Sequence, residues 1–314
     1  MLTRAEPVPT ASASDIAREL SRDGGFLQFA LPPGEGDRLT EVILDPHNAR
    51  VKLLGATATS LAEGDLSAVH AAWCERPESY TKLTVYAAAG EDGRWRELGF
   101  HTEAVIRGFF ADGTAAKVWA SYSDAARAEN PRRSSQDEIV RLATAREPTS
   151  VRLPAGYRCT GADDGLVGAA AQFLRRTFSQ YPSSLRESDL NEKIRVGSSI
   201  FRVILDESDE LAAVASAEID HRRRNAEMTD CATRPEHRGK GLMSYLLVHL
   251  ERALWDQLRI SDLYTLARAE EVGMNCVFAR LGYDYTGRLT NNCRMPDGWE
   301  SMNVWCKATA RTER

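Results

Sequence analysis

The chain has 314 residues, of which 43% are hydrophobic, and it carries a formal net charge of -5 at pH 7. This length favours two domains over one, and the hydrophobic fraction is ample for packed cores. No apolar run approaches the ~18 residues of a membrane span, and a nucleic-acid partner would need a basic surface. We therefore expect a soluble cytoplasmic protein with neither a membrane nor a nucleic acid as partner.

The composition along the chain predicts two folded domains between short tails. Residues 1–14 are rich in Ala, Ser, Thr and Pro and lack the apolar core of a secretion signal, so we expect a disordered tail. An α/β domain is expected over 15–122, a charged linker over 123–150, a second domain over 151–308 and a tail over 309–314. None of the six cysteines lies in a C-x-x-C pair, which suggests neither a zinc site nor a disulfide framework.

In the amino-terminal domain, short apolar or alternating segments predict strands, and the spacing of Leu66, Val69 and Trp73 predicts a helix. The predicted strands cover residues 39–44, 51–54, 82–87 and 115–122, and the helix covers residues 63–74. A further short helix is expected over 136–145, within the linker.

The carboxy-terminal domain is predicted to alternate helices with strands. Periodic apolar residues predict helices over 165–179 and 187–196. The expected strands cover residues 199–205, 211–219, 225–233 and 263–269. A long helix precedes the last of these strands, and its apolar stripe consists of Met243, Leu246, Leu247, Leu250, Leu254 and Leu258.

The turn between the strand at 225–233 and the long helix is the most informative segment. Gly239 and Gly241 allow the backbone to turn sharply and to approach an anion closely. The free N–H groups and the dipole of the following helix attract that anion, and Arg238 and Lys240 add positive charge. The turn therefore predicts a phosphate site, with an ordinary surface turn as the alternative.

Two other phosphate motifs do not fit this turn. A Walker loop needs Ser or Thr after Gly-Lys, whereas Lys240 and Gly241 are followed by Leu242, so the hydroxyl for a metal ion is missing. A dinucleotide fingerprint is also missing, because no G-x-G-x-x-G opens the helix. A pyrophosphate ligand that needs no metal fits best, and coenzyme A is such a ligand.

These residues and their neighbours resemble the GNAT superfamily of acetyl-CoA-dependent N-acetyltransferases. The matching pattern is Glu227-x-x-Asp230-x-x-Thr233-x-Pro235-x-x-Arg238-Gly239-Lys240-Gly241-Leu242. An apolar strand, a helix with Asn275 and Phe278, and Gly282-Tyr283 follow, so the likeness covers about residues 150–307. It implies an α/β (α+β) fold with a mixed, mostly antiparallel sheet flanked by helices. It also implies an acyltransferase that uses acetyl-CoA as co-substrate and no metal.

The same resemblance implies which residues contact acetyl-CoA. In this fold the motif strand splays from its neighbour, so its main-chain groups can pair with the pantetheine arm, and an N–H near Ala232 or Thr233 can stabilise the oxyanion. The implied cofactor-binding residues are Cys231, Ala232, Thr233, Arg238, Gly239, Lys240, Gly241, Leu242, Asn275 and Phe278. Many members protonate the leaving thiolate with a tyrosine at the position of Phe278. The acid is therefore open between Tyr283, Tyr285 and solvent.

A closer resemblance is to one GNAT family, the beta-lysine N-acetyltransferases. Its marks in the carboxy-terminal half are residues 228–233, 267–269, 273–275, 291–293 and 300–305. Its marks in the amino-terminal half are residues 45–51, 99–103 and 108–110. The likeness implies acetylation of the side-chain amine of beta-lysine, giving N-epsilon-acetyl-beta-lysine, a compatible solute that accumulates under osmotic stress.

The chemistry requires a base, because an amine attacks a thioester only when unprotonated and a lysine-like ammonium has a pKa of ~10.4. Acidic residues are poor strand formers, so Glu227 and Asp230 stand out on the motif strand as the two catalytic candidates, with Glu227 leading. Alternation places Glu227, Thr229, Cys231 and Thr233 on one face and Met228, Asp230 and Ala232 on the other. The structural alternative is an ion pair with Arg222, Arg223 or Arg224.

Direct transfer is preferred over an acyl-enzyme at Cys231, because no adjacent His activates that thiol. The expected substrate-binding residues are Glu218, Asn291, Asn292 and Glu300, since acids hold ammonium groups and amides bind both ends of an amino acid. Turn-forming asparagines are the structural alternative.

Residues 95–100 and 278–283 both resemble a helix end that leads into a strand. This similarity is either a coincidence, since the cap pattern is common, or it indicates a degenerate GNAT-like unit in the amino-terminal half. Such a unit would have no glycine-rich turn for a cofactor.

Alternatives to a beta-lysine acetyltransferase are an acetyltransferase of another small amine, such as lysine, a polyamine or an aminoglycoside, and a coenzyme A-binding sensor without turnover. A small-molecule amine is the expected partner, and a homodimer is one expected assembly.

Overall fold

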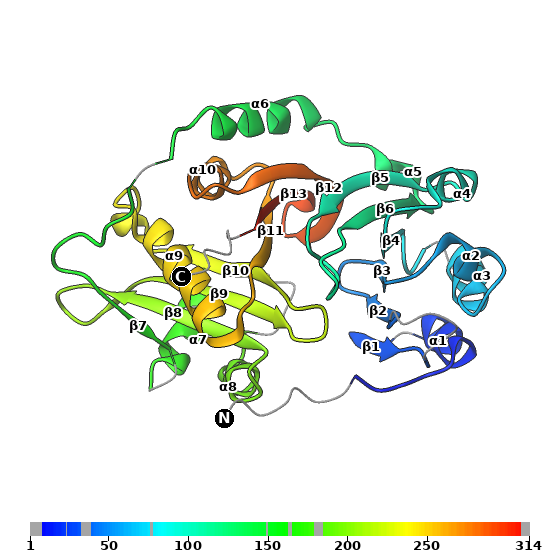
Figure 1. The fold of residues 1–314 in the computed structure, drawn as a ribbon, viewed down its shortest axis with the longest axis horizontal. Helices are drawn as coiled ribbons and strands as arrows, with labels where there is room; N and C mark the ends of the chain where they lie inside the picture. The colour runs from blue at the N-terminus through cyan, green and yellow to red at the C-terminus, as the bar shows by residue number, and fades with distance from the viewer. Residues whose placement is uncertain are drawn as a thin grey trace.

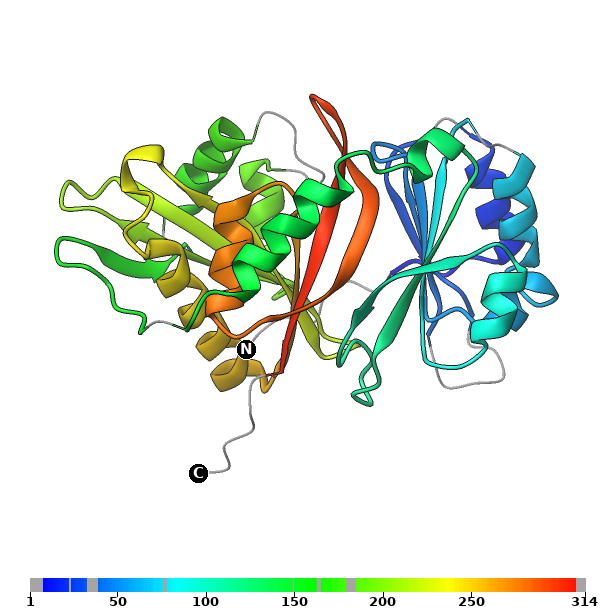
Figure 2. The ribbon, with the colours of Figure 1, turned by 90° about the horizontal axis from the view of Figure 1, so that it is seen from above.

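A single sheet of 13 strands runs through the molecule, with helices packed against it (Figures 1 and 2). This computed structural model describes residues 8–22, 24–32, 39–75, 78–148, 150–162, 165–178 and 185–308. The strand order is β1-β2-β3-β4-β6-β5-β12-β13-β11-β10-β9-β8-β7. Strands β3 and β4 run parallel, as do β10 and β11, while the other neighbouring pairs run antiparallel. The expected mixed, mostly antiparallel sheet flanked by helices is confirmed.

The amino-terminal unit contains the strands β1 (Leu27–Ala30), β2 (Glu41–Asp45), β3 (Arg50–Leu54), β4 (Lys82–Ala87), β5 (His101–Ile106) and β6 (Ala116–Tyr122). Its helices are α1 (Ala13–Leu20), α2 (Ala58–Ala62), α3 (Ser67–Glu75), α4 (Asp92–Glu97) and α5 (Ala125–Ala128). None of the helices among the described residues is both long and apolar enough to cross a membrane.

The carboxy-terminal unit contains the strands β7 (Arg158–Gly161), β8 (Ser199–Leu205), β9 (Leu211–Asp220), β10 (Asn225–Thr233), β11 (Asp262–Arg268), β12 (Asp284–Met295) and β13 (Gly298–Ala308). Its helices are α6 (Arg133–Thr144), α7 (Val167–Thr177), α8 (Glu187–Arg195), the short 3-10 helix η1 (Pro235–His237), α9 (Leu242–Leu258) and α10 (Val272–Arg280).

The first helix corrects the predicted tail. Residues 1–7 and 309–314 lie outside the described residues, but α1 already begins at Ala13. The Ser12 side chain accepts a hydrogen bond from the Asp15 backbone N–H and caps the helix, which buries Ile16 and Leu20. The Ala- and Ser-rich residues here form the capped start of a helix. The predicted disordered tail over residues 1–14 is therefore wrong for its last residues.

The predicted linker over residues 123–150 contains a helix that packs against the carboxy-terminal unit. Helix α6 begins at Arg133, three residues before the expected 136, and lies along α10 (Figure 1). It buries Gln136 and Ala143 completely, and Asp137 forms an ion pair of 2.7 Å with Arg288 of β12. The segment therefore belongs to the carboxy-terminal unit.

The two units share one topology. The order β1-β2-β3-β4-β6-β5 in the first repeats as β8-β9-β10-β11-β13-β12 in the second, with the same pair directions, and β7 extends the second. The predicted helix ends are confirmed in both units. Gly99 and Gly282 follow α4 and α10 with a φ of 82°, and a strand begins two residues later.

The units join where β5 pairs with β12 through Ala104 and Gly287. Beyond this junction the two halves of the sheet face one another and enclose a shared core (Figure 2). This core contains Tyr86 and Phe109 from the first unit and Leu289 and Val304 from the second. Side chains of both units therefore fill the space beside this junction.

Candidate functional site

The predicted phosphate turn leads from β10 through η1 into α9. Gly239 and Gly241 both have a φ of 77°, and no atom lies within 4 Å of where a Cβ would stand on either. Gly241 is the residue before the 17-residue helix α9, and no side chain caps the helix start. An exposed turn followed by uncapped N–H groups fits an anionic ligand such as a pyrophosphate.

Two tethered cations flank this turn. The Lys240 ammonium donates to the Tyr157 hydroxyl at 2.9 Å, and that hydroxyl lies 2.8 Å from Nδ1 of His237. The Arg238 guanidinium donates to the Thr233 carbonyl at 3.3 Å, and both cationic residues are exposed. The sequence did not indicate Tyr157, which holds Lys240 from outside the motif.

Strands β10 and β11 separate, as the resemblance implied. They pair only at Asn225–Asp262, Ala226–Leu263 and Glu227–Tyr264, whereas β10 continues beside β9 as far as Thr233. At Cys231, Ala232 and Thr233 the edge of β10 that faces β11 is therefore paired with no other strand of the described residues, and main-chain groups there can bind an extended ligand.

A β-bulge in β10 overturns the predicted alternation. Thr229 pairs with Ser216 and Ala232 with Val214, so two residues stand opposite one, and Asp230 has a φ of 51°. As a result Met228 and Cys231 both contact the core beneath α9, whereas Ala232 belongs to the core on the other face. Plain alternation fails because one extra residue inverts the faces.

The same bulge makes Asp230 a poor candidate for the general base. Its carboxylate is buried and accepts a short hydrogen bond from the Ser216 hydroxyl. A carboxylate held in this way is less free to take a proton from a ligand.

Glu227 has the properties of a general base. It is partly exposed, between Glu218 of β9 and Tyr264 of β11 in register. Burial and the like charge of Glu218 raise the pKa of Glu227 to about 7, while Lys52, Tyr264 and Arg50 act in the opposite direction. A base poised near neutral pH accepts a proton efficiently.

The alternative ion pairs of Glu227 with the preceding arginines do not form. Arg222 contacts Glu41 at 3.1 Å, and Arg223 contacts both Glu41 and Asp220. Glu218, expected to hold an ammonium group, lies beside Glu227 and is paired with Lys193 of α8 at 2.6 Å.

The two asparagines expected to bind substrate instead join the units. The Asn291 amide donates to the carbonyls of Arg127 and Glu129, both at 2.7 Å. The main-chain carbonyl of Asn292 accepts from Arg50 at 3.0 Å, and the residue, whose side-chain amide points to the Cys293 thiol, is 1% exposed. They stand where β12 shifts its register against β13, and the shift points this segment into the first unit.

Three further candidates are structural. Glu300 forms a bidentate ion pair with Arg268, with both distances 2.6 Å. Asn275 is fully buried, donates to two carbonyls and accepts from Asn303 and Trp305, so its amide has no capacity left for a cofactor. Phe278 is 1% exposed in the core. These contacts argue against the predicted ligand roles of Glu300, Asn275 and Phe278.

The pKa values of the Cys231 thiol and of the two tyrosines near the motif are raised, which makes these groups unsuited to act as nucleophile or acid. Burial, with the charge of Asp230, raises the pKa of Cys231 above its ordinary value and keeps the thiol protonated. Burial also raises the pKa of Tyr283, which packs edge-on against Phe278, and that of Tyr285. These shifts argue against an acyl-cysteine, and they make either phenol a weak acid.

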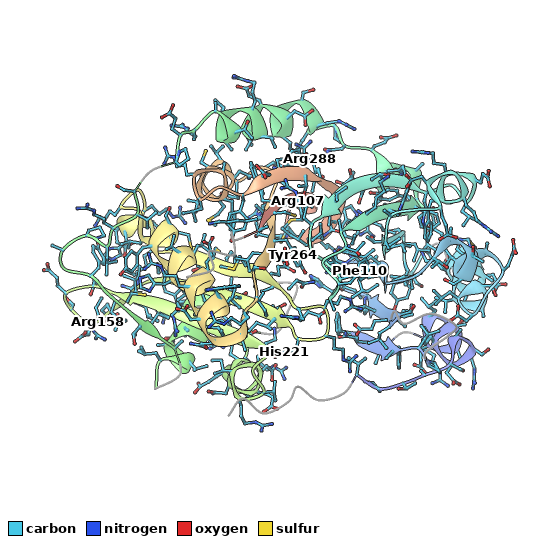
Figure 3. All side chains as sticks on the ribbon, viewed as in Figure 1. Arg107, Phe110, Arg158, His221, Tyr264 and Arg288 are labelled. Carbon is cyan, nitrogen blue, oxygen red and sulfur yellow. The ribbon has the colours of Figure 1, made fainter. Side chains whose placement is uncertain are left out.

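Sequence reasoning missed the residues that the first unit brings to this site. Tyr264 lies near the middle of the molecule, between the two units (Figure 3), and Phe109 packs against it. Lys52 of β3 is partly exposed and acts electrostatically on Glu227, and burial with the charge of Arg50 lowers its pKa to about 8. The sequence signal that could have identified Lys52 is the alternation of Arg50, Lys52 and Leu54, next to the family resemblance over residues 45–51.

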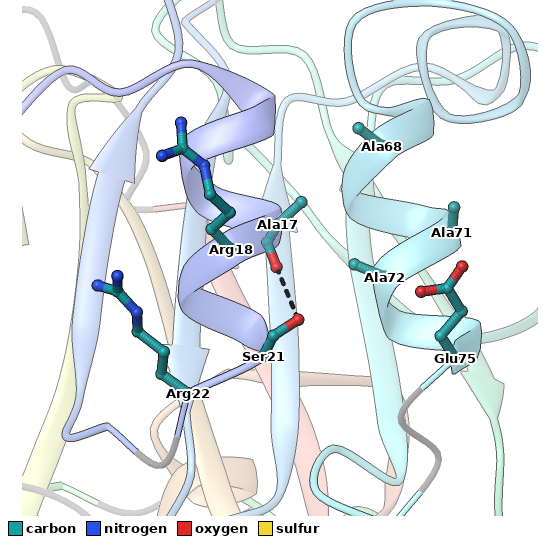
Figure 4. A pocket seen from close by; sticks show the side chains of 8 residues that line it. All are labelled: Ala17, Arg18, Ser21, Arg22, Ala68, Ala71, Ala72 and Glu75. Atoms are coloured by element: carbon teal, nitrogen blue, oxygen red, sulfur yellow. Dashed lines mark hydrogen bonds between the residues drawn. The ribbon is translucent and has the colours of Figure 1, made fainter.

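Two hollows lie away from these residues. A groove of about 520 Å³ lies between α1 and α3 and is lined by small residues with Arg18, Arg22 and Glu75 (Figure 4). A smaller one of about 100 Å³ is lined by Asp112, Arg259 and their neighbours. Neither touches the turn, Glu227 or Lys52.

Comparisons with known proteins agree with this geometry. The model of the acetyltransferase (GNAT) family matches residues 168–283. A Methanosarcina mazei protein named beta-lysine N(6)-acetyltransferase is 30% identical over 253 residues, 73% of this chain and 92% of that protein. The N-acetyltransferase YodP of Bacillus subtilis is 31% identical over 234 residues, 74% of this chain and 84% of that protein.

Among solved structures, spermidine N-acetyltransferase from Vibrio cholerae in complex with CoA and spermine covers 50% of this chain and 97% of its own, with a TM-score of 0.43 and 18% identity. The matched family model, the turn and the splayed strand concern the same segment of the carboxy-terminal unit. The chain belongs to the GNAT family of acetyltransferases, and it is an acyltransferase.

Proposed function

We propose that this enzyme transfers an acetyl group from acetyl-CoA directly to the side-chain amine of beta-lysine. The relatives named beta-lysine N(6)-acetyltransferase, one of them matched over 92% of its length, support this acceptor. The product, N-epsilon-acetyl-beta-lysine, would serve as a compatible solute in the cytoplasm during osmotic stress.

Acetyl-CoA supplies the acetyl group as a thioester. The turn from Arg238 to Leu242 would hold its pyrophosphate, because the glycines leave the backbone accessible and α9 presents free N–H groups. The edge of β10 at Cys231, Ala232 and Thr233 would pair with the pantetheine arm. A backbone N–H near Ala232 or Thr233 would face the developing oxyanion.

The observation that carries the proposal is Glu227 with a pKa of about 7, next to the point where β10 and β11 separate. A lysine-like ammonium, with a pKa of ~10.4, must lose a proton before it can attack. Glu227 would take this proton, directly or through one water, and Glu218 beside it would favour a cationic acceptor. As the new C–N bond forms and the thioester C–S bond breaks, coenzyme A would leave as a thiolate and take its proton from solvent.

The shared topology supports a duplicated, degenerate GNAT-like unit at the amino terminus. In that unit β3 is followed by the short helix α2, with Thr57 as its cap, and the segment lacks Arg-Gly-x-Gly. This unit would therefore bind no cofactor and would instead complete the acceptor site from the opposite side.

A thiol-release assay over a panel of amines, with calorimetric titration of acetyl-CoA, tests the function. We expect release with beta-lysine well above release with spermidine, lysine or an aminoglycoside. Release with a polyamine but not with beta-lysine would contradict the acceptor. Binding of acetyl-CoA without release from any amine would instead favour a sensor.

A further inference from the structure

The two units contact one another through equivalent residues. Arg50 opens β3 and donates to the Asn292 carbonyl of the second unit, at 3.0 Å. Asn225 opens the equivalent strand β10 and donates to the Phe109 carbonyl of the first unit. The first residue of each strand therefore reaches into the opposite unit.

Lys52 and Glu227 stand at the next positions on the same faces of these strands. Alternation puts Lys52 on the face of Arg50, and Glu227 on the face of Asn225. Leu54, two residues beyond Lys52, contacts the shared core. Both charged side chains thus point toward the opposite unit, and both keep partial exposure.

Two other cations on the inter-unit face of the first unit are paired with carboxylates. Arg50 pairs with Asp45 at 2.9 Å, and Lys82 pairs with Glu103 at 2.7 Å. Within the described part of the chain, by contrast, Lys52 takes part in no ion pair. Asp45 and Glu227 attract its charge without forming an ion pair with it, so the ammonium can pair with an anion that arrives with the ligand.

We propose that Lys52 binds the carboxylate of the acceptor and thereby selects an amine that also carries a carboxylate. This inference rests on the proposed function and deepens it. The cation comes from one unit and the carboxylate of Glu227 from the other, so the two charges together are complementary to an amino acid. A polyamine carries only positive charge, and Lys52 repels it. The first unit thus sets specificity although it lacks a cofactor turn.

Steady-state kinetics with beta-lysine and with its methyl ester test this role. The ester keeps both amines but has lost the anion. We expect the wild type to favour beta-lysine, and Lys52→Met to lower kcat/KM for beta-lysine about tenfold to a hundredfold, mainly through KM. The same variant should leave the ester nearly unaffected, and Lys52→Arg should retain the preference. Lys117→Met, at a lysine paired with Asp92 away from the cleft, is the control.

Equal losses with both substrates in Lys52→Met would overturn the inference, because they would mean that Lys52 acts on folding or on Glu227. An unchanged preference would overturn it as well. Acetylation of beta-lysine by the wild type would in both cases leave the proposed function standing. A wild type that acetylates neither compound would overturn the proposed function and the inference together.

Discussion

Ala104 and Gly287 pair with one another at the junction of the two units, and each lies five residues beyond its unit's helix-ending glycine, Gly99 or Gly282. They are therefore equivalent positions, and the pseudo-twofold relation between the units passes through this pair. A symmetric junction explains why contacts across the interface recur in reciprocal form, as in a homodimer fused into one chain.

Gly287 should be required at this junction. A Cβ there would lie 2.3 Å from the Glu103 carbonyl oxygen and 2.5 Å from the Ala104 Cα, and φ is 145°. We expect Gly287→Ala to lower the free energy of unfolding by about 2–4 kcal/mol, measured by chemical denaturation. Gly273→Ala on α10, where nothing lies within 4 Å, should leave stability unchanged or slightly raised. Equal effects would contradict a close approach at Gly287.

Glu227→Gln should remove the base. We expect kcat/KM for the amine to fall by about 10²–10⁴ while the affinity for acetyl-CoA is kept. In the wild type, kcat/KM should decline as the pH falls below about 7, since protonated Glu227 cannot accept a proton, and the variant should lack this limb. The exposed Glu210→Gln serves as a charge-matched control. A wild-type profile that is flat from pH 6 to pH 8 would argue against Glu227.

The same residue should also affect stability in a pH-dependent way. The folded pKa of Glu227 is about 7 and its ordinary value is 4.5, so only the folded chain binds this proton between those values. The stabilisation that results from protonation of Glu227 is complete below pH ~4.5 and is lost as the pH rises through ~7. Glu227→Gln cannot ionise, so its stability relative to wild type should increase between pH 5 and pH 8, by up to about 3 kcal/mol. Denaturant titrations of both proteins at pH 5 and pH 8 would measure their free energies of unfolding. The same difference between variant and wild type at both pH values would contradict the prediction.

The turn before α9 should tolerate no side chain when acetyl-CoA binds. Gly241 has a φ of 77°, so Gly241→Ala strains the backbone and adds a methyl group at the anion site. We expect the Kd of acetyl-CoA to rise about tenfold in calorimetry. Gly99→Ala carries a similar strain, at a φ of 82°, but lies after α4, so it should leave the Kd unchanged. If both variants bind equally well, the turn is not the pyrophosphate site.

Asn291 should matter for stability and not for substrate affinity. Asn291→Ala removes two buried hydrogen bonds to carbonyls of the first unit and leaves those acceptors unpaired. The expected loss is about 2–3 kcal/mol in the free energy of unfolding, with KM for the amine unchanged. A raised KM at full stability would restore the substrate role that the sequence suggested.

Local patterns were sufficient to predict the donor half of the site. The strand, the glycine turn and the apolar stripe of α9 are consecutive in sequence, and backbone N–H groups bind phosphate through local geometry. The bulge was not visible in this way, since Asp230 at a φ of 51° inverts the alternation without a glycine to mark it.

Tertiary structure decided the acceptor half. Arg50 and Asn292 are 242 positions apart and form a direct hydrogen bond, and the same packing brings Lys52 near enough to Glu227 to act on it electrostatically. The sequence by itself determined the fold, the family and the position of the glycine turn, because these depend on short-range periodicity and a contiguous motif. Which polar residues are bound to protein and which remain free for a ligand depends on how two units pack. That packing engages the Asn291 side chain in contacts between the units, whereas within the part of the chain that the structure describes Lys52 and Glu227 form no ion pair.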